Sequence, residues 1–260
     1  MTFWQPISTC GDDCRVGGDD RVAGVRAVLR MTALFGVLLA ALVVVPIRRG
    51  HGIRVIARGM LGALGVRMKW RGPAHRPGSL LVSNHVSWLD ILVLLALEPV
   101  RLVAKHDVEA WPGIGHLASV LGAIFVDRTR PKRLPGAVAE VTGALREGRS
   151  VAVFPEGTTF CGPERGRFRP AMFQAAVNAG APVVPISIDY GTTAAAFIGD
   201  ETLFTSVCRV AGLRGLTATV VGAPALRPEA GADRRTLARA AQASVGTSPI
   251  TSPIALELAA

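Results

Sequence analysis

Short apolar runs alternate with amphipathic stretches over most of the chain after residue 71. The runs of β-branched and aliphatic residues predict strands at 79–83, 100–104, 123–127, 150–154, 183–188 and 217–221. Helical periodicity predicts helices at 87–97, 114–121, 134–147, 171–179 and 233–245. This alternation is typical of an α/β domain, with a central sheet, mostly parallel or mixed, that helices flank.

One apolar run near the N-terminus is much longer than the others. Residues 31–47 contain no charged side chain, and arginines stand on both sides of them. A helix of this length spans about 25 Å, against about 30 Å for the hydrocarbon core of a bilayer. The pattern favours a helix that lies in, or dips into, one leaflet over a buried core helix. A cleaved signal peptide fits less well, because several aspartates precede the run.

The positive charge of the chain belongs to the same region. The formal net charge is +10, and the segment from Arg21 to Leu89 holds eleven basic residues and no acidic one. Outside it, 18 basic residues face 19 acidic ones. Basic residues around an apolar run favour an anionic membrane surface as the partner. Nucleic acid is not expected, because the segment has no aromatic-rich platform.

Composition divides the 260 residues into four parts. Residues 1–30 are expected to form a poorly ordered extension, and Met31 is a hypothetical natural start of translation. Residues 31–70 are predicted to be a basic, apolar, membrane-associating helical segment, 71–246 the main domain, and 247–260 a flexible tail. Cys10 and Cys14 form a C-x3-C pair without nearby histidines, so reduced thiols and no metal site are expected.

A candidate catalytic pair follows the first of these predicted strands. His85 lies in the turn before a predicted helix, and Ser87 and Asp90 resemble a capping box at its start. In that geometry Asp90 reaches back to the imidazole, fixes its tautomer and makes His85 a general base. The alternative, that Asp90 only caps the helix and His85 is an ordinary loop residue, fits these residues equally well.

A second polar turn, Phe154–Thr158, follows another predicted strand. Glu156 lies at the carboxyl end of that strand, where open α/β sheets bind ligands. Gly157 permits a tight turn, and the amide and hydroxyl of Thr158 can donate to an anionic ligand. An ordinary surface turn is the alternative.

Four spaced motifs resemble the glycerolipid acyltransferases of the 1-acylglycerol-3-phosphate acyltransferase family. They are N-H-x-S-x-x-D, F-x-x-R near a glycine, F-P-E-G-T, and a hydrophobic strand with a central proline. The resemblance covers roughly residues 80–190, with the motifs in the expected order. The matched positions are Asn84, His85, Ser87 and Asp90, then Phe125 and Arg128, then Phe154–Thr158, then Pro185.

The resemblance implies transfer of a fatty acyl group from acyl-CoA or acyl carrier protein to a lysolipid hydroxyl, without cofactor or metal. The leading acceptor is 1-acylglycerol-3-phosphate (lysophosphatidic acid), which would give phosphatidic acid for phospholipid synthesis at the cytoplasmic face of the cell membrane. His85 would deprotonate the hydroxyl, Asp90 would orient His85, and no acyl-enzyme would form. The implied substrate-binding residues are Arg128, Glu156, Gly157, Thr158, Phe125, Asn84, Ser87, Lys105 and Pro185.

Three of these residues can also be explained by an ordinary structural role. Arg128 suits a phosphate because a guanidinium engages two oxygens at once, but it could instead pair with Asp127. Lys105 resembles a basic residue often found between the first two motifs, although a surface lysine is the common case. Pro185 cannot donate a ladder hydrogen bond, which predicts an edge strand, a bulge or a kink that faces the site.

One departure affects the acceptor. Many family members have arginine directly after F-P-E-G-T, whereas Thr159 and Phe160 follow here. Another lysolipid, such as lyso-ornithine lipid, is therefore the alternative acceptor. A lipid hydrolase is less favoured because the chain has no G-x-S-x-G elbow. A non-catalytic membrane-binding protein would not need four motifs in order.

Overall fold

A mixed sheet forms the centre of the molecule. The computed structural model describes residues 6–15, 20–73, 77–111 and 113–246. Within these ranges the sheet has seven strands in the order β1-β7-β6-β2-β5-β3-β4. Their bounds are β1 Arg67–Arg71, β2 Leu80–Ser83, β3 Arg101–Lys105, β4 Ile124–Val126, β5 Val151–Val153, β6 Val183–Asp189 and β7 Thr217–Gly222.

Strand direction divides the sheet into two parts. Neighbouring strands from β6 to β4 are parallel, whereas β7 is antiparallel to β6 and β1 is parallel to β7. The expected α/β class with a mixed sheet is confirmed. Residues 67–70, expected to end the membrane-associating helical segment, are not helical but belong to β1, which pairs with β7 at the edge of the sheet. Its alternation of basic and apolar residues fits an edge strand with one face exposed.

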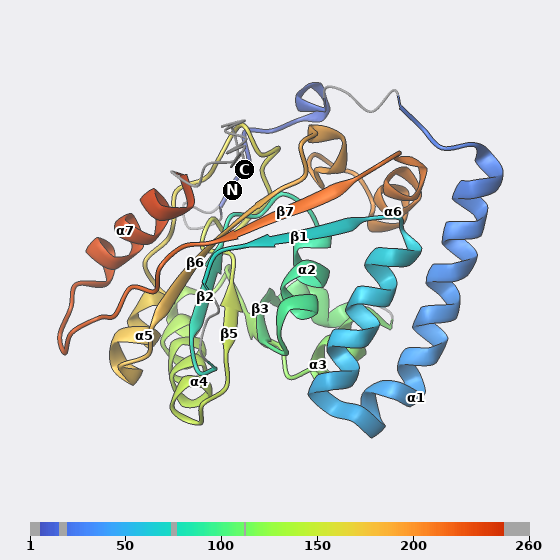
Figure 1. Cartoon of the computed structure of the whole chain (residues 1–260). Coiled ribbons are helices and arrows are strands. Elements are labelled where there is room, and N and C mark those ends of the chain that lie inside the picture. Colours follow the sequence, from blue (N-terminus) through green and yellow to red (C-terminus); the bar gives the residue numbers. More distant parts are fainter. Residues whose placement is uncertain (1–5, 16–19, 74–76, 112, 247–260) are drawn as a thin grey trace, which may run out of the picture.

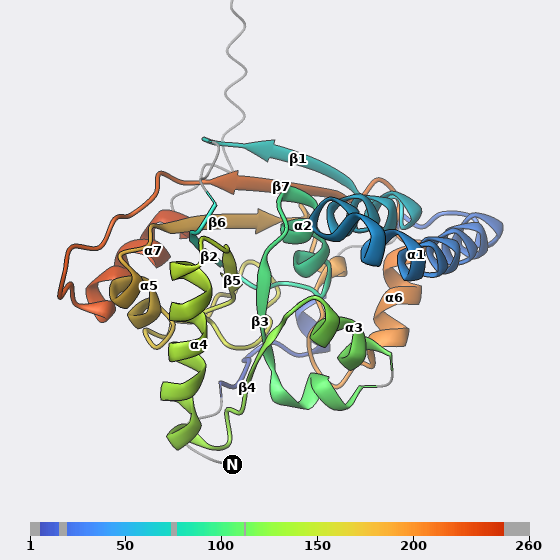
Figure 2. The same cartoon turned by 90° about the horizontal axis from the view of Figure 1, so that it is seen from below.

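Helices cover both faces of the sheet (Figures 1 and 2). On one face lie α1 (Gly24–Ala63), α2 (Leu89–Leu97) and α6 (Leu203–Gly212), which pack with Leu81 of β2. On the other lie α4 (Leu134–Arg146), α5 (Phe173–Ala179) and α7 (Arg234–Gly246), which pack with Leu80 and Val82. The short α3 (Ile114–Val120) precedes β4. Helix α6 was not predicted from the sequence.

Helix α1 is bent into two antiparallel arms (Figure 1). A Cβ atom added to Gly52 would lie 2.7 Å from the carbonyl oxygen of Val44. Residues eight apart in a straight helix are about 12 Å apart along the axis, so the bend lies between these two positions. Pro46 falls in this stretch and removes one helical hydrogen bond.

The two arms of α1 have different surroundings. The second arm packs against α2, where Arg58 Nε donates to the carbonyl oxygen of Ala96 at 3.1 Å. The first arm is the outer one and belongs to Gly24–Arg48, a stretch long and apolar enough to cross a membrane by length and composition. Large apolar side chains exposed on it include Val25, Val28, Leu29, Phe35, Leu39, Leu42, Val43 and Ile47.

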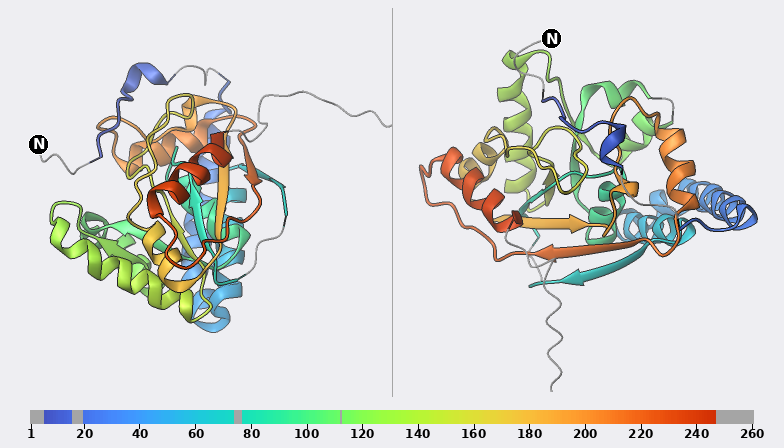
Figure 3. Two further views of the ribbon diagram at one scale, coloured as in Figure 1. Left: turned by 90° about the vertical axis from the view of Figure 1, so that its left-hand side faces the viewer. Right: turned by 90° about the horizontal axis from the view of Figure 1, so that it is seen from above.

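The N-terminal segment lies against the main domain, close to the loop after β5 (Figure 3). Residues 6–15 include a short 3-10 helix, Asp12–Cys14, and a buried Cys10. Arg15 pairs with Glu201 at 3.3 Å and donates to the carbonyl oxygen of Ile198 at 2.5 Å. The expectation of a poorly ordered extension is therefore wrong for residues 6–15. The expected tail, 247–260, lies outside the described residues.

Candidate active site

The turn between β2 and α2 carries the first motif. The helix begins at Leu89 with Trp88 at the N-cap, and the hydroxyl of Ser87 makes no capping hydrogen bond. The predicted capping box is therefore only half formed. Asp90 reaches back, and its Oδ2 atom accepts hydrogen bonds from the backbone amides of Val86 at 2.7 Å and Ser87 at 2.8 Å.

His85 and Asp90 form the predicted pair. The Nδ1 atom of His85 lies 2.9 Å from Oδ2 of Asp90. Asp90 is fully buried, while 18% of the His85 side chain is exposed. A carboxylate can only accept, so Nδ1 carries the proton and Nε2 keeps its lone pair. This tautomer is the one that a general base needs.

Tyr190 completes the hydrogen bonding of Asp90. This residue directly follows β6, and its hydroxyl donates to Oδ1 of Asp90 at 2.7 Å. Burial and the neighbouring Asp90 carboxylate raise the pKa of Tyr190, so the phenol stays protonated as a donor. Sequence analysis missed this residue. The available signal was its position just after the fourth motif, as the one tyrosine of the chain.

The third motif packs directly on the first. The ring of Phe154 stacks on the His85 imidazole, with centroids 3.9 Å apart and an interplanar angle of 13°. The backbone amide of Phe160 donates to the carbonyl oxygen of His85 at 2.8 Å. Phe154 therefore holds the ring of His85 on one face, and Phe160 holds its backbone.

Glu156 ties the two motifs together. Its Oε2 atom accepts from the backbone amide of His85 at 2.7 Å, and Oε1 accepts from the amide of Gly166 at 3.0 Å. The side chain is buried, and burial raises its pKa from 4.5 to about 7. Both oxygens bond to the backbone, so Glu156 joins the two motifs, and the substrate contact expected from the sequence stays a prediction.

Arg128 contacts the turn after Glu156. Its guanidinium donates to the carbonyl oxygen of Gly157, whose φ of 78° is a left-handed conformation that favours glycine. The salt bridge between Arg128 and Asp127 is not formed, and Asp127 pairs with Arg130 at 3.5 Å. Burial and the nearby Arg169 lower the pKa of the half-buried Arg128, which still stays charged near neutral pH.

Two cavities border the loop after β5. One, of about 700 Å³, is lined by Arg128, Gly157, Val126, Leu134, Val138 and Met172 among others. The other, of about 450 Å³, is lined by residues that include Glu156, Phe160, Arg167 and Arg169. His85 lines neither of them. The wall of the larger cavity thus combines the guanidinium of Arg128 with apolar side chains.

Two other predicted site residues, Asn84 and Ser87, are buried. Asn84 is buried, donates to the carbonyl oxygen of Ile188 at 2.9 Å and accepts from its amide at 2.8 Å. This joins the first motif to β6. The hydroxyl of Ser87 is buried and has no hydrogen-bond partner among the described residues.

Three further predicted site residues, Lys105, Phe125 and Thr158, lie at different places in the fold. Lys105 is exposed and pairs with Asp107. Phe125 is half-buried on β4 and, by strand alternation, points away from the cavity that Val126 lines. Thr158 is half-buried beside Gly157. The expected positions of this set are therefore only partly brought together.

Pro185 does not lie at an edge, because β6 pairs with both β2 and β7. Its carbonyl oxygen accepts from the amide of Ala223, just after β7 ends at Gly222, and the pairing resumes at Val183 and Leu226. Pro185 therefore accepts one hydrogen bond but donates none to Ala223, at the point where the regular β6–β7 ladder ends. The register shifts by one residue before Val183 pairs with Leu226, as in the bulge that was one of the predictions.

The site has the parts of a base-catalysed transfer to a hydroxyl, and comparison with known proteins gives its class. A model of the acyltransferase family matches residues 66–189. A 1-acyl-sn-glycerol-3-phosphate acyltransferase of Neisseria meningitidis is 32% identical over 182 residues, which are 67% of this chain and 71% of that protein. A lyso-ornithine lipid O-acyltransferase of Pseudomonas aeruginosa is 35% identical over 246 residues, covering 86% and 93%.

The chain belongs to this acyltransferase family. It is an acyltransferase enzyme. The crystal structure of the 1-acyl-sn-glycerophosphate acyltransferase of Thermotoga maritima matches with a TM-score of 0.62 at 20% identity, covering 85% of this chain and 93% of that one. This likeness shows that the two proteins share a fold.

Proposed function

We propose that the enzyme transfers a fatty acyl group from acyl-CoA or acyl carrier protein to the free hydroxyl of 1-acylglycerol-3-phosphate. The observation that carries the proposal is the His85 imidazole, held through Nδ1 by a buried carboxylate and left with Nε2 as its basic nitrogen. The hydrogen bonds to Asp90 and the stacking of Phe154 fix this orientation before substrate binds. Such preorganisation lowers the cost of reaching the transition state.

The reaction then needs no covalent enzyme intermediate. Nε2 of His85 accepts the proton of the lysolipid hydroxyl, and the oxygen attacks the thioester carbonyl carbon. A tetrahedral oxyanion forms and collapses, the new ester C–O bond remains, and the C–S bond breaks. The imidazolium of His85, stabilised by Asp90, returns its proton to the departing thiolate. Products are the acylated lipid and a free thiol.

Arg128 supports a phosphate-bearing acceptor. It is held near the site through Gly157, and it lines the larger cavity. A half-buried guanidinium binds phosphate more strongly than an exposed one, because water competes less. In this proposal the phosphate contacts Arg128, whereas Glu156 and Asn84 only hold the framework.

Lyso-ornithine lipid is a second candidate acceptor. One observation favours it: the relative named for this substrate matches over 93% of its length. The resemblance of the third motif to the family also leads us to expect arginine where Thr159 stands. The Thr159 hydroxyl donates to the carbonyl oxygen of Phe197 and therefore serves the backbone. One cation fewer suits a head group with less negative charge.

The proposal also places the enzyme on the cytoplasmic face of the membrane. The first arm of α1 exposes a continuous set of apolar side chains, and basic residues surround it in the sequence. Burial of this face in one leaflet would remove apolar surface from water, while the arginines would meet anionic head groups. The lysolipid could then reach His85 without leaving the bilayer.

The deciding experiment offers labelled acyl-CoA or acyl carrier protein to membranes that contain the protein. The acceptors are lysophosphatidic acid, lyso-ornithine lipid and other lysophospholipids. His85→Ala should lower transfer on the order of 10² to 10⁴-fold, which is the usual contribution of a general base. His116→Ala is the matched control, because His116 is exposed on α3.

Each outcome has a defined meaning. Phosphatidic acid made by the wild type and by His116→Ala, but not by His85→Ala, supports the proposal. Acylation of lyso-ornithine lipid alone keeps the mechanism and changes the acceptor. Release of free fatty acid without an acceptor would indicate a hydrolase, and activity of His85→Ala near the wild-type rate would rule out the proposed base.

A further inference from the structure

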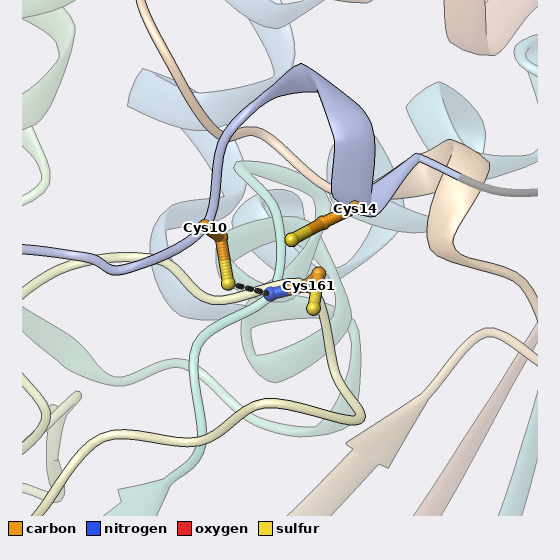
Figure 4. A group of neighbouring side chains, drawn as sticks. All are labelled: Cys10, Cys14 and Cys161. Atoms are coloured by element: carbon orange, nitrogen blue, oxygen red, sulfur yellow. Dashed lines mark hydrogen bonds between the residues drawn. The ribbon is translucent and has the colours of Figure 1, made fainter.

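Three cysteines from distant parts of the sequence meet beside the active site. Cys10 and Cys14 come from the N-terminal segment, and Cys161 comes from the loop after β5 (Figure 4). Their sulfur atoms all lie within 4.8 Å of one another, and all three are free thiols. The spacing of the C-x3-C pair alone suggested an isolated pair, but Cys161 lies beside it.

We propose that Cys10, Cys14 and Cys161 bind one Zn²⁺ ion as thiolates, with a water molecule as the fourth ligand. Zinc–thiolate bonds of about 2.3 Å in a tetrahedron place sulfur atoms about 3.8 Å apart. Thiols already within 4.8 Å reach this spacing by small side-chain rotations. Among the described residues, this group contains no fourth His, Cys, Asp or Glu.

The surroundings suit thiolates that are bound to a cation. The backbone amide of Cys161 donates to Sγ of Cys10 at 3.3 Å, and the amide of Glu164 faces the Cys161 thiol. Amide hydrogen bonds of this kind stabilise the charged form of sulfur and orient metal ligands.

The access and the number of ligands agree with a mononuclear site. Cys10 and Cys161 are buried, whereas Cys14 is half-buried. Iron–sulfur clusters are typically held by four thiolates. The fourth cysteine of the chain, Cys208, is exposed on α6 and does not belong to the group.

A disulfide is the competing use of these thiols. A bond between any two would leave the third sulfur without a partner of its kind. The three-way proximity is instead the arrangement that a single soft cation requires. Reducing compartments also disfavour stable disulfides and leave thiolate sites to metals.

The ion would act as a clip between the N-terminal segment and the active-site loop. Cys161 directly follows Phe160, whose amide bonds to the His85 carbonyl oxygen. A Cβ atom added to Gly157 would lie 2.8 Å from the Pro6 side chain, so the segment already lies close to that turn. Zinc would hold residues 6–15 against the loop that carries F-P-E-G-T.

The test measures metal binding and does not depend on acyl transfer. Full-length protein is purified in detergent with a metal-free reductant, and bound metal is counted after Zn²⁺ is added and excess removed. We expect one ion per chain for the wild type and for Cys208→Ser, the matched control. Cys10→Ser, Cys14→Ser and Cys161→Ser should each weaken binding at least tenfold, because each removes a thiolate.

Co²⁺ gives a second readout on the unaltered protein. Binding should produce thiolate-to-cobalt charge-transfer absorption in the near ultraviolet and intense visible bands typical of tetrahedral coordination, both displaced by Zn²⁺. This readout decides the question even if a variant fails to fold. Absence of these bands in the wild type, or metal binding that survives in all three single variants, would overturn the proposal.

Proteolysis tests the clip itself. A chelator should speed tryptic cleavage after Arg15 and Arg21 in the Zn²⁺-loaded wild type and in Cys208→Ser, but not in Cys14→Ser. Thiol labelling and mass spectrometry under the same conditions identify the competing state. A stoichiometric disulfide among the three cysteines in the presence of reductant, without bound metal, would replace the zinc site by a redox bond.

Discussion

The two loops that form the site are held in different ways. In the turn from Asn84 to Asp90 the candidate catalytic pair is formed locally, because one carboxylate serves the ring and two backbone amides less than six residues away. Distant residues, among them Glu156 and Tyr190, add further hydrogen bonds to this turn. The loop from Phe154 to Arg169 is held from outside, by Arg128 and by the N-terminal segment. The contact between His85 and Asp90 is thus local in the sequence, while the position of the second loop depends on the packing of distant parts of the chain.

Among the variants that test the two loops, Asp90→Asn should lower kcat the most. The amide keeps the shape of the side chain, but its nitrogen cannot accept the hydrogen bonds that Oδ2 receives. The His85 ring then loses its tautomer preference and the charge that stabilises the imidazolium, so kcat should fall on the order of 10² to 10⁴-fold.

The measurement is acyl transfer at saturating acceptor, together with a thermal melt. Asp200→Asn is the control, since Asp200 is exposed. A kcat near the wild-type value would show that the His85 ring does not need Asp90.

Arg128→Ala tests the externally held loop. Loss of a guanidinium that bonds a charged phosphate costs about 1.5–3 kcal/mol, or roughly 10- to 100-fold in KM for lysophosphatidic acid. The KM for zwitterionic lyso-ornithine lipid should change less. Arg130→Ala is the matched control, because Arg130 is exposed and pairs with Asp127. Equal changes in KM for both acceptors would argue against a phosphate contact.

The local loop is also the part that sequence could predict. The approach of Asp90 to His85 follows from their spacing and from the turn between a strand and a helix. The α/β class follows from the alternation of apolar runs. The catalytic and binding roles themselves stay predictions, which the variants above are designed to test.

The parts that sequence could not predict depend on contacts between distant residues. Strand β1 alternates basic and apolar residues, which fits a membrane interface as well as an edge strand, and only its pairing with β7 separates the two. The contacts of Tyr190 and Cys161 cannot be derived from neighbouring residues, since their partners lie about 100 and 150 residues away. The covering of the site by residues 6–15 is likewise a product of tertiary packing.

Glu156→Gln breaks the link between the two loops. A glutamine has one accepting oxygen, so either the His85 amide or the Gly166 amide loses its partner. The loss of one hydrogen bond to a charged group should lower kcat by roughly tenfold or more, with a smaller change in KM. Glu140→Gln, on the exposed side of α4, is the control.

The same variant has a pH signature. Burial raises the pKa of Glu156 from 4.5 to about 7, so between these values the folded protein holds a proton that the unfolded chain has released. The stability of the wild type should therefore fall as pH rises from about 4.5 to about 7, and Glu156→Gln should lack this component. If the stability of both proteins changed equally with pH across this range, the raised pKa of Glu156 would be contradicted.

Tyr190→Phe should have the smallest effect, and it measures how far the local turn relies on the rest of the fold. The variant removes only the hydroxyl that donates to Oδ1 of Asp90, while Oδ2 keeps His85 and the two backbone amides. A buried carboxylate oxygen that loses one donor costs about 1–3 kcal/mol, so the melting temperature should drop by several degrees. The expected fall in kcat is about three- to tenfold, because the orientation of His85 becomes less fixed. The KM for the acceptor should stay unchanged, because the proposed phosphate contact at Arg128 is not altered.

Trp88→Phe is the control, since it removes a nearby donor to Ser206 and leaves Asp90 intact. If Tyr190→Phe melts earlier at full kcat, Tyr190 serves stability alone, and the turn orients His85 without support from β6.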